Sequence, residues 1–398
     1  MHARFLSRDI KLEEVFTRIG VHPDGIEILK RKAETYRIFI SGLSPVCANI
    51  IKQEMLAAGG DAAIPMDAIS GKGEQCDLVL LGTEKSLKIF LKKLQKQPFN
   101  LGAIARQIEG IFEDRNKALH GLWKTSKRTL VLETPLIMGV LNITPDSFSD
   151  GGTFFEPEAA VERARQMIRE GVDIIDVGAE STRPGSDPVP AEEEIRRLSG
   201  VLEEIVSLGK PVSVDTYKPE VARFALERGA EIINDIYGLR KEGMAEVVAE
   251  FDAGVCIMHM LGEPKTMQEN PLYRDLITEI YEFLGNRIEF AESKGIEKEK
   301  IVIDPGIGFG KTVSQNYEII ERLDEFLSLG RPLLIGTSRK SFIGKVIDSP
   351  PLQRVSATVG INMAALIAGA RILRVHDVKE HVELIKLYKM LKSERKNY

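Results

Sequence analysis

The sequence predicts an α/β protein: a (β/α)8 TIM barrel preceded by a small α/β or α+β domain at the amino terminus. From residue 136 onward, eight short apolar runs alternate with helical stretches, a pattern typical of parallel strands that are buried on both faces. The eight units occupy about 265 residues, which is the size of a closed barrel. A doubly wound open sheet is the alternative, and the eight regular units favour closure instead.

Each of the eight runs ends in polar residues or glycine. The runs are LIMGVLNI (136–143), DIIDVGA (173–179), PVSVDT (211–216), EIINDI (231–236), GVCIMHM (254–260), IVIDPG (301–306), PLLIGTS (332–338) and RILRVHD (371–377). Between them lie amphipathic segments such as 191–208, in which apolar residues recur at helical spacing. We therefore expect the barrel to cover residues 134–398.

The first 125 residues have a different pattern of expected strands and helices. Strands are expected at 36–43 and 76–83, and helices at 44–60 and 82–97. We expect residues 1–125 to form a small domain and residues 126–133 to form a linker, and the charged stretch 113–128 contains the one tryptophan, Trp123. The pattern assigns no task to this domain, and dimerisation or regulation, small-ligand binding and a scaffold role all remain open.

Composition limits the classes of function. The 398 residues include 54 Lys and Arg against 59 Asp and Glu, so no basic surplus indicates a nucleic-acid partner. No apolar run reaches the roughly 20 residues that a membrane span requires, and residues 1–16 are too charged for a signal peptide. The three cysteines lack metal-ligand spacing, which favours a reducing compartment. We expect a cytoplasmic protein without a membrane partner.

Polar side chains gather at the ends of the expected strands, where closed barrels carry their catalytic groups. Asp215, Asn234 and Asp304 offer carboxylate and amide groups suited to a flat nitrogen heterocycle with several N–H donors. A guanidine-like edge pairs with a carboxylate through two parallel hydrogen bonds. An isolated aspartate at such a place also caps a turn or helix, but its repetition on successive strands favours a binding site.

A second subsite is expected where the first and eighth strands meet. Asn142, Arg374 and His376 lie on these neighbouring strands, where barrels often bind phosphate. The amide oxygen of Asn142 also suits a metal ion. Lys340 lies between the two subsites, and Ser341 opens a helix whose free N–H groups suit a second anion such as a carboxylate.

Three further features have simpler explanations. The segment GIGFGKT (306–312) resembles a phosphate-binding P-loop, but that pattern needs glycine at the position of Pro305. Packing in the core explains His259 as well as a functional role does. We expect His381, on the last helix, to lie at the surface.

Eight motifs, in order, resemble the dihydropteroate synthase family, the folate-pathway enzymes that sulfonamides inhibit. They are MGVLNITPDSFSDGG (138–152), GAESTRPGS (178–186), SVDT (213–216), IINDI (232–236), MHM (258–260), IDPGIGFGKT (303–312), GTSRKSFIG (336–344) and RVHDV (374–378). The resemblance covers residues 133–398. Before the last strand only Gln353 and Arg354 keep part of the family's common pattern, which we interpret as packing variation.

The resemblance implies a transferase that condenses 6-hydroxymethyl-7,8-dihydropterin diphosphate with 4-aminobenzoate, giving 7,8-dihydropteroate and diphosphate. By the family pattern, Asp215, Asn234 and Asp304 bind the pterin ring. Lys340 reaches the pterin carbonyl and the aminobenzoate. Asp215, Asp304 and Lys340 are therefore the expected catalytic residues.

The family pattern also implies an anion site. Asn142 holds Mg2+ together with the diphosphate, and Arg374 and His376 bind the diphosphate directly. The other expected substrate-binding residues are Thr182 and Arg183 in the second loop, Met258 in the pocket wall, and Phe309 and Ser341 around the aminobenzoate. A homodimer is the family expectation, with small molecules as the remaining partners.

Two other functions are kept as alternatives. A pterin-binding methyltransferase barrel shares the carboxylate and amide pocket, but it is not expected to carry TPDSFSDGG or SRKSFIG. A catalytically silent pterin carrier would not need the anion set of Asn142, Arg374 and His376.

Overall fold

The structure is a computed structural model that describes residues 3–7, 10–71, 73–144, 157–181, 188–263, 267–268 and 271–392. It divides into two compact units, Met1–Ile111 and Phe112–Tyr398. Each unit is built around an apolar core of its own. Within the described part of the chain, no helix combines the length and apolar character needed to cross a membrane.

The second unit contains an eight-stranded parallel sheet. Its strands are β6 (Leu136–Asn142), β7 (Ile174–Gly178), β8 (Val212–Asp215), β9 (Ile232–Asp235), β10 (Gly254–Met258), β11 (Ile301–Asp304), β12 (Leu334–Ile335) and β13 (Ile372–Val375). Neighbours follow the order β11-β10-β9-β8-β7-β6-β13-β12, and a parallel bridge between Ile303 and Leu333 joins the two ends of this order. Each strand lies within a run expected from the sequence, and the predicted barrel is confirmed.

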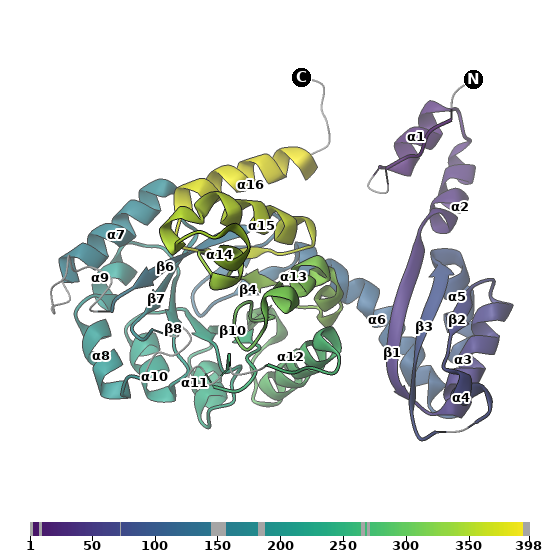
Figure 1. Ribbon diagram of the computed structural model, residues 1–398, viewed down its shortest axis with the longest axis horizontal. Coiled ribbons are helices and arrows are strands. Elements are labelled where there is room, and N and C mark those ends of the chain that lie inside the picture. The colour runs from purple at the N-terminus through teal and green to yellow at the C-terminus, as the bar shows by residue number, and fades with distance from the viewer. Residues whose placement is uncertain are drawn as a thin grey trace. The chain divides into compact units, whose positions relative to one another are not determined.

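Helices surround this sheet (Figure 1). They are α7 (Pro157–Glu170), α8 (Ala191–Ser199), α9 (Leu202–Ser207), α10 (Pro219–Glu227), α11 (Met244–Glu250), α12 (Leu276–Ser293), α13 (Val313–Glu321), α14 (Ser341–Ile347), α15 (Val355–Ile367) and α16 (Val378–Lys392), with short 3-10 turns at Lys298–Lys300, Leu323–Leu329 and Pro351–Gln353. The expected helix at 191–208 is two helices, because the chain leaves helical geometry at Val201 after Gly200, a poor helix former.

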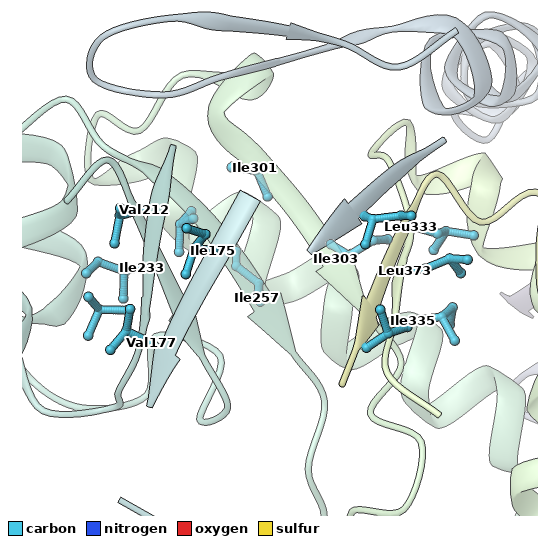
Figure 2. Packing of buried hydrophobic residues seen from close by; sticks show 14 of the residues in the cluster. Ile175, Val177, Val212, Ile233, Ile257, Ile301, Ile303, Leu333, Ile335 and Leu373 are labelled. Carbon is cyan, nitrogen blue, oxygen red and sulfur yellow. The ribbon is translucent and has the colours of Figure 1, made fainter. Parts of the chain in front are cut away.

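Alternation along the strands sorts side chains between the two faces of the sheet. Ile175, Val177 and Ile233 belong to the core that also includes helix residues, and Figure 2 shows side chains of this cluster distributed around the strands. Their neighbours Ile174 and Ile232 belong to a separate cluster inside the barrel. On β7, β9, β11 and β13 the next inward positions toward the carboxyl ends are polar, and they build the candidate site: Asp176, Asn234, Asp304 and Arg374.

A hairpin of β4 (Leu122–Lys124) and β5 (Thr129–Val131) covers the amino-terminal ends of the barrel strands. Trp123 is fully buried in the interior cluster, and its indole N–H donates to the carbonyl oxygen of Lys300, immediately before β11, at 2.9 Å. The segment 126–133 was expected to be a linker, and it instead forms the turn and second strand of this hairpin. The compact units consequently divide earlier than residue 125, between residues 111 and 112.

The first unit contains a three-stranded antiparallel sheet in the order β1-β3-β2. Its elements are α1 (Leu12–Arg18), α2 (Pro23–Ala33), β1 (Thr35–Leu43), α3 (Pro45–Ala57), β2 (Asp61–Ala63), α4 (Met66–Ile69), β3 (Cys76–Thr83) and α5 (Glu84–Leu94), and α6 (Leu101–His120) runs from this unit into the second. Helices α3 and α5 begin where sequence predicts, because Ser44 and Thr83 accept hydrogen bonds from free amides of the first turns.

Candidate active site

Four acidic or amide side chains line the inside of the barrel toward the carboxyl ends of the strands. They are Asp176 on β7, Asp215 on β8, Asn234 on β9 and Asp304 on β11, and each is at most 7% exposed. The Nδ2 group of Asn234 donates to Oδ2 of Asp176 at 3.3 Å, and Oδ1 of Asp304 accepts from the amide of Gly306 at 2.7 Å. The three residues expected to bind a heterocycle therefore share one buried region.

Asp176 belongs to this group although sequence reasoning did not select it. It lies inside the apolar run DIIDVGA, whereas the prediction used only the polar residues that follow that run. A carboxylate in the middle of a buried strand was itself a signal, because burying a charge without partners is costly.

Arg374 is the cation that faces these carboxylates. Its Nε donates to Oδ2 of Asp176 and one of its terminal NH2 groups donates to Oδ2 of Asp215, each at 2.6 Å. The sequence placed Arg374 in the anion subsite. In the structure it bridges two carboxylates, which balance the charge of a guanidinium that is only 21% exposed.

Several buried oxygens beside Arg374 have no hydrogen-bond partner among the described residues. They are Oδ1 of Asp176, Oδ1 of Asp215 and Oγ of Ser213. An unsatisfied buried polar atom costs about 1–3 kcal/mol, and a carboxylate oxygen can only accept. The arrangement therefore suits a ligand that brings several N–H donors into the barrel.

The barrel interior shifts the pKa values of its ionisable groups. Burial raises the pKa of Asp215 to about 7, and the charge of Arg374 opposes this rise. Burial also raises the pKa of Asp304, against the effect of Lys340. Burial lowers the pKa of Lys340 to about 8, with Asp304 opposing. Asp215 and Lys340 therefore titrate near neutral pH, as catalytic acids and bases often do.

Lys340 extends over the glycine-rich turn that follows β11. Its Nζ donates to the carbonyl oxygen of Ile307 and lies 4.6 Å from the centre of the Phe309 ring. Phe309 and Met258 belong to one apolar cluster, in which Met258 is 3% exposed. Ser341 is exposed at the start of α14 and lines a surface hollow with residues that include Lys345 and Arg354.

The expected anion-binding residues lie at the ends of β6 and β13. Asn142 ends β6, and a Cβ atom on the adjacent Gly178 would lie only 3.3 Å from its Oδ1. His376 follows β13, with its Nδ1 3.0 Å from Oγ of Ser338. Thr182 and Arg183 lie outside the described residues, as do residues 145–156 of the first loop.

A second charged cluster lies beside the ends of β7 and β8. The Lys218 ammonium contacts the carboxylates of Glu180 and Glu194, and the Tyr217 hydroxyl donates to Glu180 at 3.1 Å. Burial raises the pKa of Glu194 to about 7, against the effect of Lys218. The Tyr217 ring stacks on Tyr237 with centroids 4.5 Å apart. Sequence reasoning did not select this cluster, since its members are separated along the chain.

A closed barrel with buried carboxylates and partly buried cations at the carboxyl ends of its strands is the arrangement of a barrel enzyme. Comparison with known proteins specifies its family. The sequence profile of the pterin binding enzyme family matches residues 138–376. Dihydropteroate synthase of Escherichia coli K12 is 47% identical over 270 residues, which are 68% of this chain and 96% of that protein.

Two further relatives extend this comparison. A solved structure of Xanthomonas albilineans dihydropteroate synthase with 4-aminobenzoic acid is 42% identical, with a TM-score of 0.65, and covers 69% of this chain and 99% of its own. A probable bifunctional folylpolyglutamate synthase/dihydropteroate synthase of Halobacterium salinarum is 38% identical over 376 residues. That match covers 94% of this chain and 45% of the relative. The chain belongs to the dihydropteroate synthase family of pterin-binding enzymes.

Proposed function

We propose that this chain condenses 6-hydroxymethyl-7,8-dihydropterin diphosphate with 4-aminobenzoate and releases 7,8-dihydropteroate and diphosphate. One observation carries the proposal: Asp176 and Asp215 each present a buried carboxylate oxygen without a partner among the described residues, in the region that also holds Asn234 and Asp304. A pterin ring has a guanidine-like edge and ring N–H groups that donate to such oxygens. Membership of a transferase family supports the same reaction.

The pterin ring binds inside the barrel. Asp215, Asn234 and Asp304 accept from and donate to its polar edge, and Lys340 reaches its carbonyl oxygen. Arg374 donates to Oδ2 of Asp215, and the guanidine-like edge of the pterin can donate to the other oxygen of the same carboxylate.

The reaction begins with loss of diphosphate. The bond between the pterin methylene carbon and the diphosphate oxygen breaks, and the electron-rich dihydropterin ring carries the positive charge that remains. The carboxylates of Asp215 and Asp304 stabilise this cation electrostatically, while Arg374 and His376 offset the growing charge on the leaving diphosphate. The carboxylates of Asp215 and Asp304 are already in place in the folded barrel, so they need little reorganisation.

Capture of the cation completes the reaction. The arylamine nitrogen attacks the methylene carbon, a C–N bond forms, and the nitrogen then loses a proton to solvent. No strong base is required, because an arylamine is neutral at pH 7 and its lone pair is available. Phe309, Met258 and Ser341 form the arylamine side of the site, with Thr182 and Arg183 contributed by the second loop. Sulfonamides, which are arylamine analogues, are expected to compete there.

We assign Mg2+ to the anion subsite, with Asn142 as its protein ligand. An amide oxygen is a suitable hard ligand, and Mg2+ commonly keeps several waters and binds substrate phosphates rather than an all-protein cage. Bound Mg2+ supplies positive charge to the leaving diphosphate. Titration calorimetry tests the assignment: Mg2+ should tighten diphosphate binding to the parent protein and not to Asn142→Leu.

The oligomeric state and the cellular compartment are also proposals. Family resemblance supports a homodimer, which light scattering measures directly. The three cysteines are unpaired, which supports a reducing compartment such as the cytoplasm.

Diphosphate release tests the proposed reaction. The full-length protein is incubated with the pterin diphosphate, with and without 4-aminobenzoate, and diphosphate is measured together with the pteroate product. We expect stoichiometric formation of both, dependent on 4-aminobenzoate, and loss of both in Asp215→Asn. Pterin binding without aminobenzoate-dependent release would instead indicate a pterin carrier.

A further inference from the structure

A buried lysine attaches the glycine-rich turn after β11 to the residues that follow β10. Lys311 is 2% exposed, and its Nζ lies 3.0 Å from Nδ1 of His259 and 2.9 Å from the carbonyl oxygen of Phe309. The amide of His259 donates in turn to the carbonyl oxygen of Asp304 at 2.9 Å. Lys311 therefore connects two segments that border the candidate site.

Two glycines allow the turn to approach residues 259–261 closely. A Cβ atom on Gly306, whose φ is +74°, would lie 1.8 Å from the carbonyl oxygen of His259. A Cβ atom on Gly310, whose φ is +66°, would lie 2.7 Å from Cβ of Leu261. A side chain is excluded at both positions by backbone conformation and by space. The motif that resembles a P-loop is thus a packing motif, and Lys311 contacts a histidine and a backbone carbonyl.

Lys311 can make the same two hydrogen bonds whether its side chain is charged or neutral. Burial lowers the pKa of Lys311 to about 7, with Asp304 opposing and Lys340 adding to the fall. Burial, Lys311 and Arg240 all lower the pKa of His259 well below its ordinary value, so the ring is neutral at pH 7. A neutral ring accepts through Nδ1 when its proton is on the other nitrogen. An ammonium and a neutral amine both have enough N–H groups to donate to this nitrogen and to Phe309.

The same turn is held from its other side by Lys340. The Lys340 ammonium donates to the carbonyl oxygen of Ile307 and lies over the Phe309 ring. Lys311 binds the backbone of Phe309, and Lys340 lies against its side chain. The position of this ring relative to Lys340 therefore depends on the backbone contact that Lys311 makes.

We propose that Lys311 is a positioning residue for the arylamine substrate, because its hydrogen bonds to Phe309 and His259 fix the turn that places the Phe309 ring beside Lys340. Lys311 acts through this turn and touches neither substrate. The inference rests on the proposed function, since it assigns Phe309 to the arylamine side of that site.

Kinetics of full-length Lys311→Met test the proposal, with each substrate varied separately. We expect KM for 4-aminobenzoate to rise about tenfold or more, because small displacements of a substrate-positioning group are costly. KM for the pterin diphosphate should change by less than about threefold, since the interior carboxylates remain in place. Lys379→Met, at an exposed lysine on α16, is the matched control and should leave both constants unchanged.

Two further variants separate hydrogen bonding from charge and from folding. Lys311→Gln can still donate to the Phe309 carbonyl but carries no charge, so it should restore KM for 4-aminobenzoate to within about threefold of the parent and keep the parent pH profile. His259→Leu removes the other partner of the lysine and should reproduce the arylamine-selective rise. Circular dichroism establishes whether each variant folds. If Lys311→Met does not fold, the kinetics of Lys311→Gln and His259→Leu test the positioning role.

Each outcome has a definite meaning. Unchanged kinetics in folded Lys311→Met, or equal rises in both KM values, would overturn the positioning role. Failure of Lys311→Gln to rescue, together with a shifted pH profile, would overturn it in favour of a charge effect. An inactive parent protein would contradict the proposed function itself, so the two failures are distinguishable.

Discussion

The two compact units differ in the side chains that they bury. In the described part of the first unit, Ser86 is the one buried polar side chain, and the rest of the core is apolar. The barrel buries many polar and charged groups, among them Asp176, Asp215, Asp304 and Lys311. Burying such groups costs free energy unless they are paired. The comparison locates the chemistry in the barrel and leaves the role of the first unit open.

The largest effect is expected from removing charges inside the barrel. Lys340→Ala and Asp304→Ala should each lower turnover by at least about tenfold, because each removes charge facing the reacting ring. Lys379→Ala, at an exposed position on α16, is the control. The diphosphate-release assay measures all three. Near-normal kinetics in either site variant would refute the assigned roles.

Two truncations test where the separation of the units lies. Removing residues 1–125 also removes Trp123 and half of the β4–β5 hairpin, and should destabilise the barrel by about 3–5 kcal/mol or more, the cost of losing a large buried aromatic. Removing residues 1–111 keeps the hairpin and should leave kcat within about threefold, because every described site residue remains. Urea unfolding and turnover measure these effects. Equal stability of the two truncated chains would show that the hairpin is dispensable.

A core substitution in the first unit should separate its stability from catalysis. Phe90→Ala removes a fully buried ring from that unit and should cost about 3–5 kcal/mol of unfolding free energy. Phe39→Ala, at a side chain that is 50% exposed, should cost less than about 1 kcal/mol. Neither should change turnover of protein that remains folded. Thermal unfolding and kcat, measured on the same samples, provide the check. A parallel loss of kcat would mean that the units are functionally coupled.

The pH dependence should follow from two groups in the barrel. Burial raises the pKa of Asp215 to about 7, against Arg374, so its ionised form and activity should increase as pH rises through 7. Burial lowers the pKa of Lys340 to about 8, against Asp304, so its charge and activity should decline above pH 8. A profile of kcat/KM against pH should be bell-shaped with its maximum between these values. A flat profile from pH 6 to 9 would contradict these assignments.

The same aspartate gives a stability effect of opposite direction. The pKa of Asp215 is about 7 in the folded protein, where burial raises it against Arg374, and 3.8 is its ordinary value. Between these values the folded state binds the extra proton, so the unfolding free energy of the ligand-free protein should fall as pH rises. In Asp215→Asn this fall should be smaller. Urea titrations at pH 5 and pH 7 measure the difference.

Sequence patterns predicted the helices and strands and the location of the site, because both depend on which residues are neighbours along the chain. Near-continuous apolar runs identify buried parallel strands, and the residues that end those runs meet at one rim. Asp215, Asn234 and Asp304 were found in this way. Contacts between distant segments were not predictable from such patterns, and the pairing of Trp123 with the carbonyl of Lys300 is one example.

Side-chain partners were the other limit of prediction. His381 was expected at the surface, but it is fully buried, with Nε2 2.9 Å from Nδ2 of Asn362 and Nδ1 2.6 Å from the carbonyl oxygen of Asp377. The two carboxylate partners of Arg374 likewise depend on rotamer and charge in three dimensions, and its role toward an anion stays a prediction. Residue type determines which interactions a side chain can make, whereas the fold determines which neighbour it contacts.

The hairpin under the barrel has a kinetic consequence. Trp123 closes the end where the strands begin, so we expect both substrates to reach the site from the carboxyl ends of the strands. Asn234 and Asp304 are buried there, whereas Ser341 is exposed. An arylamine bound first would obstruct entry of the pterin. We therefore expect ordered addition, with the pterin diphosphate before the arylamine, and initial-rate kinetics with both substrates varied measure the order.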